Sequence, residues 1–260
     1  MRDHRVEIQS SDRIRQRPEA EPVDLAVLYE DDSLIALDKP AGMVVHPTYK
    51  NTSGTLLNGV LWRFRDRTDV QPGILTRLDK GTSGLVIIAL TAELHARMQR
   101  DGAAGRMTKQ YLALVHGSPD PPTGTIELPL ARDLDDRRRV VVAERGSPCT
   151  TRYEVVAQVE SPPGHPDRPT DRLRSVVRCD LVTGRTHQIR VHLAALGCPI
   201  VGDATYGEPS DEIGRQALHA WRVSLVHPVT RAQLTLEAPL PDDMRALAPM
   251  PVRSMPSDGR

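Results

Sequence analysis

The sequence has 260 residues, of which 39% are hydrophobic, and its 34 lysines and arginines balance 34 aspartates and glutamates. A chain of this length can bury a sizeable core, as one large domain or as two small ones. No apolar run approaches the roughly 20 residues that span a bilayer, and the N-terminal residues lack the apolar segment of a secretory signal, so we expect a soluble, cytoplasmic protein.

The first predicted elements are strands. Residues 1–22 are polar, charged and without an apolar period, so we expect a disordered tail there and a fold that begins near Val23. Runs with strand character follow at 25–32 (LAVLYEDD) and 33–40 (SLIALDKP), and the apolar run LVIIAL at 85–90 predicts a buried strand.

A helix and another strand follow in the middle of the chain. Residues 91–100 (TAELHARMQR) predict a helix in which Thr91 is the N-cap and Leu94 and Met98 share one face. Apolar residues alternate at 109–117 (KQYLALVHG), which predicts a strand.

The second half of the chain continues with strands. Residues 140–159 and 172–182 have strand character, and the segment 160–172 between them contains four prolines, which predicts a mobile loop. Residues 219–241 predict a hairpin, and the Pro-rich residues 248–260 predict a flexible tail.

One helix is predicted at residues 184–197 (GRTHQIRVHLAALG). We expect Ile189, Leu193 and Leu196 on its buried side and Gly197 as its C-terminal stop. With few helices among many strands, the pattern indicates an α+β domain rather than alternating β-α units.

The charge is unevenly distributed. Residues 1–38 contain ten acids and five arginines, so the rest of the chain carries a net charge of plus five. Residues 172–192 hold five arginines and two histidines against one acid, Asp180. A basic stripe of that density could contact phosphates, and a solvated strand and helix face is the alternative.

No cofactor motif is present. Cys149, Cys179 and Cys198 are widely spaced without a CxxC pair, which suggests neither a disulfide framework nor a thiolate metal site. His187 and His192 lack the HExxH pattern of a zinc site, and the chain has no GxxxxGK[ST] or GxGxxG. We therefore expect no metal and no cofactor.

Three side chains could share one pocket. Asp79 precedes the buried strand at 85–90, where a turn aspartate that caps backbone amides is the alternative. Arg190 lies beside the apolar face of its helix and Tyr111 lies within a strand. A surface arginine and a core tyrosine are the ordinary interpretations, and the periodicity leaves them open.

Five strings, in this order, resemble the successive motifs of the RluA-type RNA pseudouridine synthases: KPAGMVVHP, RLDKGTSGLVIIALT, TKQYLALVHG, GRTHQIRVHLAALGCPIVGDATYG and LHAWRVSLVHPVT. The resemblance extends from about Val23 to about Leu247. It implies the pseudouridine synthase fold, an α+β fold with a mixed, mostly antiparallel central sheet and flanking helices, in one catalytic domain of residues 23–247.

The resemblance implies an isomerase that detaches uracil from C1′ of a uridine in ribosomal or transfer RNA and rejoins it through C5. The target base must first leave the stack. The aspartate of RLDxxTSG is the catalytic residue of this family, and that position is Asp79. It either attacks as a nucleophile or removes the C2′ proton, and the sequence leaves both routes open. No metal or cofactor is implied.

The other motif positions receive roles by the same resemblance. Arg190 of THQIR is expected to pair with Asp79 and to hold it ionised and oriented. Tyr111 of the KxY motif is expected to stack on the target uracil, and Leu218 of LHAW to close the other side of the base pocket.

Four further residues are assigned to substrate binding. Arg77 of RLD is expected to contact the RNA and to help occupy the space left by the extruded nucleotide. Thr82, with its neighbours Ser83 and Gly84, is expected to shape the turn that aims the aspartate. Arg185 and His187 lie in the basic stretch and are assigned to RNA contact.

Two features depart from the family pattern. Thr76 stands where the family usually has His, which puts in doubt any RNA contact made by that side chain. Many members begin with a small basic S4 domain, and residues 1–22 are too short and too acidic to form one. We therefore expect the RNA affinity to come from the catalytic domain. The resemblance also implies a monomer, because most enzymes of this family are expected to act as monomers.

Two other functions compete with this one. A non-catalytic RNA-binding or folding factor could use the same fold, but it would have no chemical need for Asp79, Arg190 and Tyr111 together. A nucleoside or glycoside hydrolase could place an aspartate beside a sugar carbon, but it needs a second carboxylate to activate water. The motif around Asp79 contains none.

Overall fold

The computed structural model of the protein describes residues 18–48, 50–160 and 173–248. The tails predicted at 1–22 and 248–260 and the loop predicted at 160–172 fall almost entirely outside the described residues. Contacts with the fold begin ahead of Val23: the Asn58 side-chain amide donates to the Glu19 carbonyl (2.7 Å), and the Glu21 amide donates to the Asn58 carbonyl (3.1 Å).

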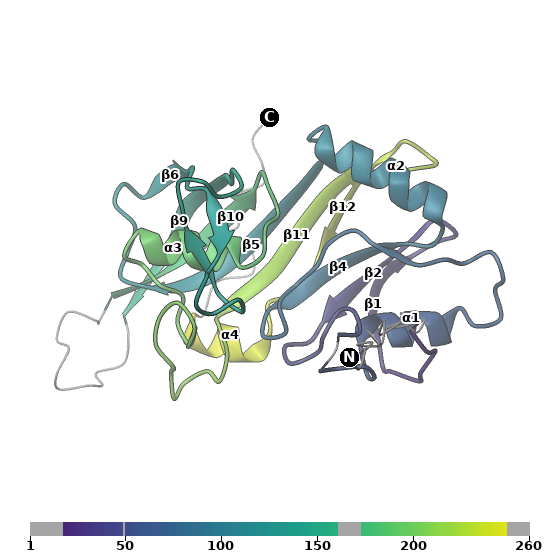
Figure 1. Cartoon of the computed structure of the whole chain (residues 1–260), viewed down its shortest axis with the longest axis horizontal. Coiled ribbons are helices and arrows are strands. Elements are labelled where there is room, and N and C mark those ends of the chain that lie inside the picture. The colour runs from purple at the N-terminus through teal and green to yellow at the C-terminus, as the bar shows by residue number, and fades with distance from the viewer. Residues whose placement is uncertain (1–17, 49, 161–172, 249–260) are drawn as a thin grey trace, which may run out of the picture.

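Twelve strands occur in the described residues: β1 Ala26–Glu30, β2 Leu34–Lys39, β3 Gly73–Ile74, β4 Ser83–Ala89, β5 Met107–His116, β6 Thr123–Ile126, β7 Leu130–Arg132, β8 Val140–Val142, β9 Thr151–Glu160, β10 Leu173–Leu181, β11 Leu218–Val226 and β12 Gln233–Glu237. Ten of them form one sheet in the order β1-β2-β4-β11-β5-β10-β9-β6, with β12 beside β11 and β3 beside β4 (Figure 1). β7 and β8 form a separate hairpin.

The sheet is mixed and mostly antiparallel, as the sequence predicted. Only β4 and β11 pair in parallel among the described strands, through His219 beside Ser83 and Ala220 beside Gly84. β11 and β12 pair antiparallel, which confirms the hairpin predicted near the end of the domain.

Four helices accompany these strands in the described part of the chain: α1 Leu56–Arg63, α2 Ala92–Ala103, α3 Gln188–Ala195 and α4 Asp242–Leu247. α2 was predicted, and Thr91 caps it by accepting a hydrogen bond from the Leu94 amide (3.3 Å). α1 was not predicted, although its signal is present, because Thr55 and Asn58 form a capping box at its start.

The prediction for α3 is confirmed except at its end. Ile189 and Leu193 are buried, and Gly197 takes the left-handed conformation (φ 75°) that ends the helix. The expected burial of Leu196 is wrong, since its side chain is 38% exposed. The helix ends at Ala195, and Leu196, as the C-cap, has turned off the buried face.

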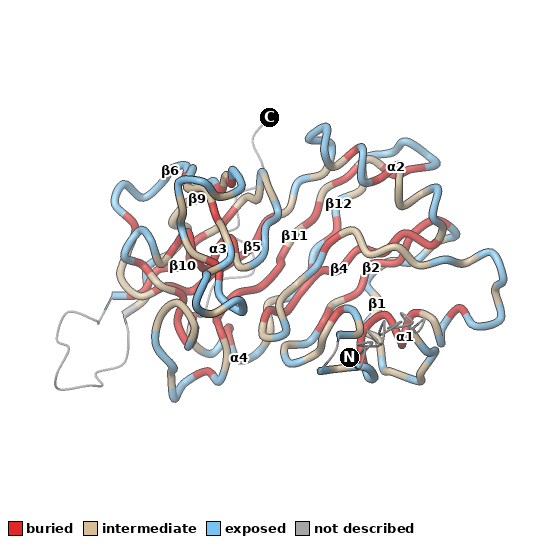
Figure 2. The backbone as a smooth tube through the Cα atoms, in the orientation of Figure 1, coloured by how far each residue is buried: buried red, intermediate tan, exposed pale blue. Residues whose placement is uncertain are grey.

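β4 is buried along its whole length (Figure 2). Leu85 and Ile87 pack into the large core cluster with β5 and β11, whereas Val86 and Ile88 pack into a second cluster with α1. A strand covered on both faces has no polar side to present, which explains the unbroken apolar run LVIIAL.

Lys39, at the end of β2, is fully buried. Its ammonium donates to the carbonyls of Pro40 (2.8 Å), Met43 (2.9 Å) and Lys80 (3.4 Å). These bonds tie the loop after β2 to the turn that contains Asp79. Burial lowers the pKa of Lys39 to about 8.

Replacing Lys39 by Met should lower the free energy of unfolding by about 2–3 kcal/mol, because buried carbonyls lose a charged donor. The unfolded lysine titrates near pH 10.4 and the folded one near pH 8. Between these values the unfolded chain binds more protons, so Lys39 contributes increasing stability as the pH rises. In urea unfolding, the difference in the free energy of unfolding between wild type and Lys39→Met should therefore shift in favour of the wild type as the pH rises from about 8 to about 10.4.

Lys50→Met is the matched control, since Lys50 is exposed and forms no hydrogen bond with a described residue. It should leave stability and its pH dependence unchanged. Parallel stability curves for wild type and Lys39→Met above pH 8 would contradict the assigned titration.

Candidate active site

Asp79 lies in the turn that leads into β4. The Thr82 amide donates to the Asp79 carbonyl (3.0 Å), and the Gln216 side chain donates to the Thr82 hydroxyl (3.1 Å). Gly84 adopts φ +108°, and a Cβ there would lie 2.2 Å from the Ala220 carbonyl oxygen of β11. The hydrogen bonds of Thr82 and the close packing of Gly84 against β11 thus hold the turn in place.

The Asp79 carboxylate caps no backbone amide of the described residues, which removes the ordinary turn interpretation. Its Oδ2 instead accepts a hydrogen bond from the Arg190 guanidinium (3.0 Å). Its side chain remains 26% exposed, and Oδ1 has no hydrogen-bond partner in the described part of the chain. One carboxylate oxygen is therefore available to a substrate.

Arg190 is buried, at 6% exposure, and is not a surface arginine. Its Nε and Nη2 both donate to Asp203 at 2.7 Å, while Nη1 donates to Asp79. Burial alone would lower the pKa of Arg190, but the two carboxylates raise it above its usual value. The guanidinium is permanently charged and held in one orientation by the bidentate pair.

Asp203 is the fixed end of this bridge. Its side chain is 1% exposed, and Oδ1 also accepts the backbone amides of Thr205 (3.0 Å) and Tyr206 (3.3 Å). Burial would raise the pKa of Asp203, but Arg190 and these amides lower it below its usual value. The carboxylate is therefore ionised, fully bonded and unavailable for chemistry.

His187 approaches the same carboxylate oxygen of Asp79 as Arg190 does. Its Nε2 lies 3.8 Å from Asp79 Oδ2, and its Nδ1 lies 2.7 Å from the Tyr206 hydroxyl. Burial lowers the pKa of His187, which favours the neutral ring near pH 7. The Val140 amide donates to the same hydroxyl (2.8 Å), so the hydroxyl can donate to Nδ1 and leave an Nε2–H facing Asp79.

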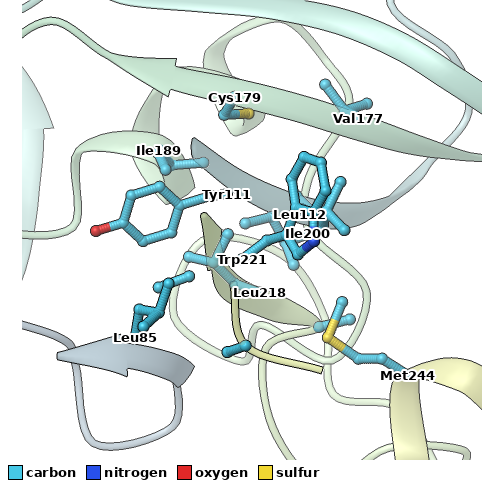
Figure 3. Packing of buried hydrophobic residues seen from close by; sticks show 14 of the residues in the cluster. Leu85, Tyr111, Leu112, Val177, Cys179, Ile189, Ile200, Leu218, Trp221 and Met244 are labelled. Atoms are coloured by element: carbon cyan, nitrogen blue, oxygen red, sulfur yellow. The ribbon is translucent and has the colours of Figure 1, made fainter. Parts of the chain in front are cut away.

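Tyr111 and Leu218 form an apolar wall. They lie on neighbouring strands, β5 and β11, and are 6% and 5% exposed. Figure 3 shows the Tyr111 ring between Ile189 and Leu85, with its hydroxyl directed away from the other labelled side chains. Burial, and then the charge of Asp79, raise the pKa of Tyr111, so it is a neutral phenol.

One cavity of about 640 Å³ brings the predicted site together. Its lining includes every residue assigned from the sequence: Arg77, Asp79, Thr82, Tyr111, Arg185, His187, Arg190 and Leu218. The volume is typical of a small-molecule site and can hold one nucleoside. Arg77 and Arg185 are exposed, which leaves two cations at the solvent side of the cavity.

The basic stripe at 172–192 is mostly paired internally. Arg178 binds Glu154 (2.6 Å), Arg174 binds Glu212, and Arg190 binds two aspartates. Arg172 lies outside the described residues. Of the described arginines in this segment, Arg185 alone forms no ion pair with a described residue, so the stripe is not a phosphate-binding surface as a whole.

Thr76 points inward. It is 4% exposed, and its hydroxyl accepts a hydrogen bond from the Ile87 amide (2.8 Å) while the residue lines the cavity. The side chain at this position therefore stabilises the junction with β4.

Within the described ranges, no group of three or more His, Cys, Asp or Glu side chains could hold a metal ion. None of the helices built from these residues is long and apolar enough to cross a membrane.

All three cysteines are buried and free.

Residues 33–195 match the protein family described as RNA pseudouridylate synthase. The chain is 39% identical to Ribosomal large subunit pseudouridine synthase D of Nitrosomonas europaea, over 93% of this chain and 69% of the relative. Its identity to the protein of the same name from Pseudomonas aeruginosa is 36%, over 86% of this chain and 71% of the relative. The Bacillus subtilis relative, Uncharacterized RNA pseudouridine synthase YlyB, is 37% identical over 88% and 73% of the two chains.

Solved structures agree. Human RNA Pseudouridylate Synthase Domain Containing 1 is similar with a TM-score of 0.65 at 26% identity, covering 85% of both chains. Human RNA Pseudouridylate Synthase Domain Containing 4, at 22% identity and a TM-score of 0.64, shares the fold. The chain belongs to the RNA pseudouridylate synthase family and is of the RluA type. It is an isomerase that converts uridine to pseudouridine in RNA.

Sequence reasoning missed Asp203 and Tyr206. Both lie in GDATYG, at the end of the fourth motif string, but nothing in the spacing connects them with Arg190 and His187. A buried arginine needs a buried carboxylate partner, so the burial of Arg190 would have prompted a search for one. That burial is known only from the structure.

Replacing Asp203 by Asn should weaken the hydrogen bonds and the ion pair that fix Arg190. We expect a loss of about 3 kcal/mol in the free energy of unfolding, because a buried charge loses its partner. The turnover number should fall about 10- to 100-fold as Arg190 loses its fixed orientation. Glu154→Gln, which removes the partner of Arg178 away from the cavity, is the control and should keep the turnover number. Unchanged turnover in a folded Asp203→Asn enzyme would contradict the positioning role.

Proposed function

We propose that the protein isomerises uridine in large-subunit ribosomal RNA, with Asp79 as the catalytic residue. The names of the Nitrosomonas europaea and Pseudomonas aeruginosa relatives support this substrate. The sequence alone left ribosomal and transfer RNA both open, and the lack of a recognisable S4 domain mildly favoured a compact target such as a transfer RNA arm. The observation that carries the catalytic assignment is the hydrogen bonding of Asp79. Arg190 holds one carboxylate oxygen, and the other has no hydrogen-bond partner among the residues that the structure describes, while Asp79 lines the cavity.

The geometry supports a division of roles. A uracil extruded from its RNA stacks on Tyr111, with Leu218 opposite, and brings its sugar–base bond to Asp79. The free oxygen then serves either as the nucleophile or as the base that removes the C2′ proton, and both routes use the same atom. Arg190 orients the carboxylate throughout, and Arg77 fills the space that the base has left.

The competing functions fit less well. A binding-only factor would not need a buried arginine that aims a carboxylate into an open cavity. A hydrolase needs a second carboxylate to activate water. Asp203, which Arg190 also holds, is 1% exposed and has both oxygens occupied.

We also propose that one chain suffices and acts in the cytoplasm without a metal or cofactor. Every side chain assigned to the chemistry comes from this chain and lines one cavity. Asp79, Arg190 and Tyr111 provide the charge and the stacking surface that the isomerisation needs.

Asp79→Asn should abolish pseudouridine formation while preserving the fold and RNA binding. In a strain that lacks the gene, carbodiimide treatment and reverse-transcription stops on large-subunit RNA should reveal a site restored by the wild type and not by Asp79→Asn. Asp66→Asn is the control, since Asp66 is 86% exposed. Persistent pseudouridine with Asp79→Asn would refute the catalytic assignment, and release of free uracil would support the hydrolase.

Tyr111→Phe should retain stacking and lose the hydroxyl. The hydroxyl has no hydrogen-bond partner among the described residues, and we expect it to take part in moving the C5 proton. Burial and the charge of Asp79 raise its pKa and keep it a neutral phenol, so it can take up the C5 proton only as it passes its own proton to a base. The turnover number should fall about 100-fold with little change in KM, whereas Tyr111→Leu should also raise KM. Single-turnover measurements separate the two effects, and full activity of Tyr111→Phe would limit this residue to stacking.

A further inference from the structure

Lys109 is a cation in the cavity to which the proposed chemistry gives no role. It lies on β5 two residues before Tyr111, so both side chains are on the same face of the strand. Both line the cavity, and Gln110 between them does not. Lys109 is half-buried beside the stacking surface.

This ammonium has no counter-charge among the residues that the structure describes. Lys109 forms no hydrogen bond or ion pair with any described residue, in contrast to Lys39 with its three carbonyls. Burial lowers the pKa of Lys109.

The segment Gly184–Arg185 lies against this lysine. A Cβ at Gly184 would be 3.4 Å from the Lys109 Nζ, so the glycine leaves the ammonium uncovered. The next residue, Arg185, is exposed and lines the same cavity. Two cations of neighbouring segments therefore line the same cavity.

The unpaired charge of Lys109 indicates which kind of group would bind there. A partly desolvated ammonium gains most from an anion, and RNA at neutral pH offers anions only as phosphodiesters. Uracil is neutral, and its carbonyl groups would leave the charge uncompensated.

We propose that Lys109 and Gly184–Arg185 form a phosphate subsite that binds the backbone phosphodiester next to the extruded uridine. The proposal rests on the proposed function, in which Tyr111 and Asp79 receive that uridine. Anchoring the phosphate holds the RNA backbone in place while the base is detached and turned. No bond is made or broken by the subsite.

The test is the salt dependence of binding. The full-length protein is titrated with a short single-stranded oligouridylate, which carries phosphates and uridines whichever natural RNA is the substrate. Removing one phosphate contact should lower the slope of log Kd against log salt by about 0.7. We expect this change for Lys109→Met, with affinity lost about tenfold at low salt and restored by Lys109→Arg. Lys50→Met, an exposed lysine outside the cavity, should match the wild type.

Each outcome decides the proposal. An unchanged affinity, or a weaker affinity with an unchanged slope, overturns it, the second because Lys109 would then bind a neutral group. Thermal unfolding verifies that Lys109→Met is folded, and the slope of Lys109→Gln provides an independent second variant. The measurement involves no turnover, so a failure of the Asp79 assignment or of the ribosomal substrate appears in the rRNA mapping and leaves this result readable.

Discussion

The site depends on how one buried guanidinium distributes its hydrogen bonds. Burying Arg190 at 6% exposure would cost several kcal/mol without compensation. Asp203 supplies it with two bonds of 2.7 Å and is itself neutralised by that pair. The Nη1 amino group is then fixed in direction, and it donates to Asp79. The Asp79 carboxylate can stay partly exposed because Asp203 holds its partner, Arg190, in place.

The fold brings these groups together through its only parallel strand pair among the described residues. β4 and β11 pair in parallel, with Ser83 beside His219, so both strands begin at the same end of the sheet. The turn with Asp79 precedes β4, and Leu218 begins β11. β5 runs antiparallel to β11 and places Tyr111 opposite Ala220. Segments more than 100 residues apart thus meet at one cavity, and Lys39 and Gln216 clamp the turn between them.

Much of this arrangement could be predicted from the sequence, and the remainder could not for a physical reason. The motif strings led to Asp79, Arg190, Tyr111 and Leu218, all of which line one cavity. The unbroken run LVIIAL correctly indicated a buried strand. Asp203 was missed because a charge pair depends on which side chains meet in space, and the spacing of 13 residues carries no periodic signal.

The same reason explains why the basic stretch at 172–192 could not be interpreted from the sequence. Arginine density along the chain left a phosphate-binding stripe and a solvated face both open. A strand sends alternate side chains to opposite faces, and a sheet brings in acids from its neighbours. Glu154, opposite Arg178 on the neighbouring strand β9, pairs with it in this way, and Arg174 pairs with Glu212 in the loop before β11.

The capacity of this neutral chain to bind RNA therefore depends on which cations remain unpaired and where they lie. Arg77, Lys109 and Arg185 line the cavity, and none forms an ion pair with a described residue. Charges that are paired within the protein contribute little to attraction at a distance, because each is cancelled by its partner. Three uncancelled cations around one opening create a local positive potential despite zero net charge. These cations attract the RNA backbone. Arg190 carries one positive charge against the two negative charges of Asp203 and Asp79, so this group leaves one negative charge that the three cations outnumber.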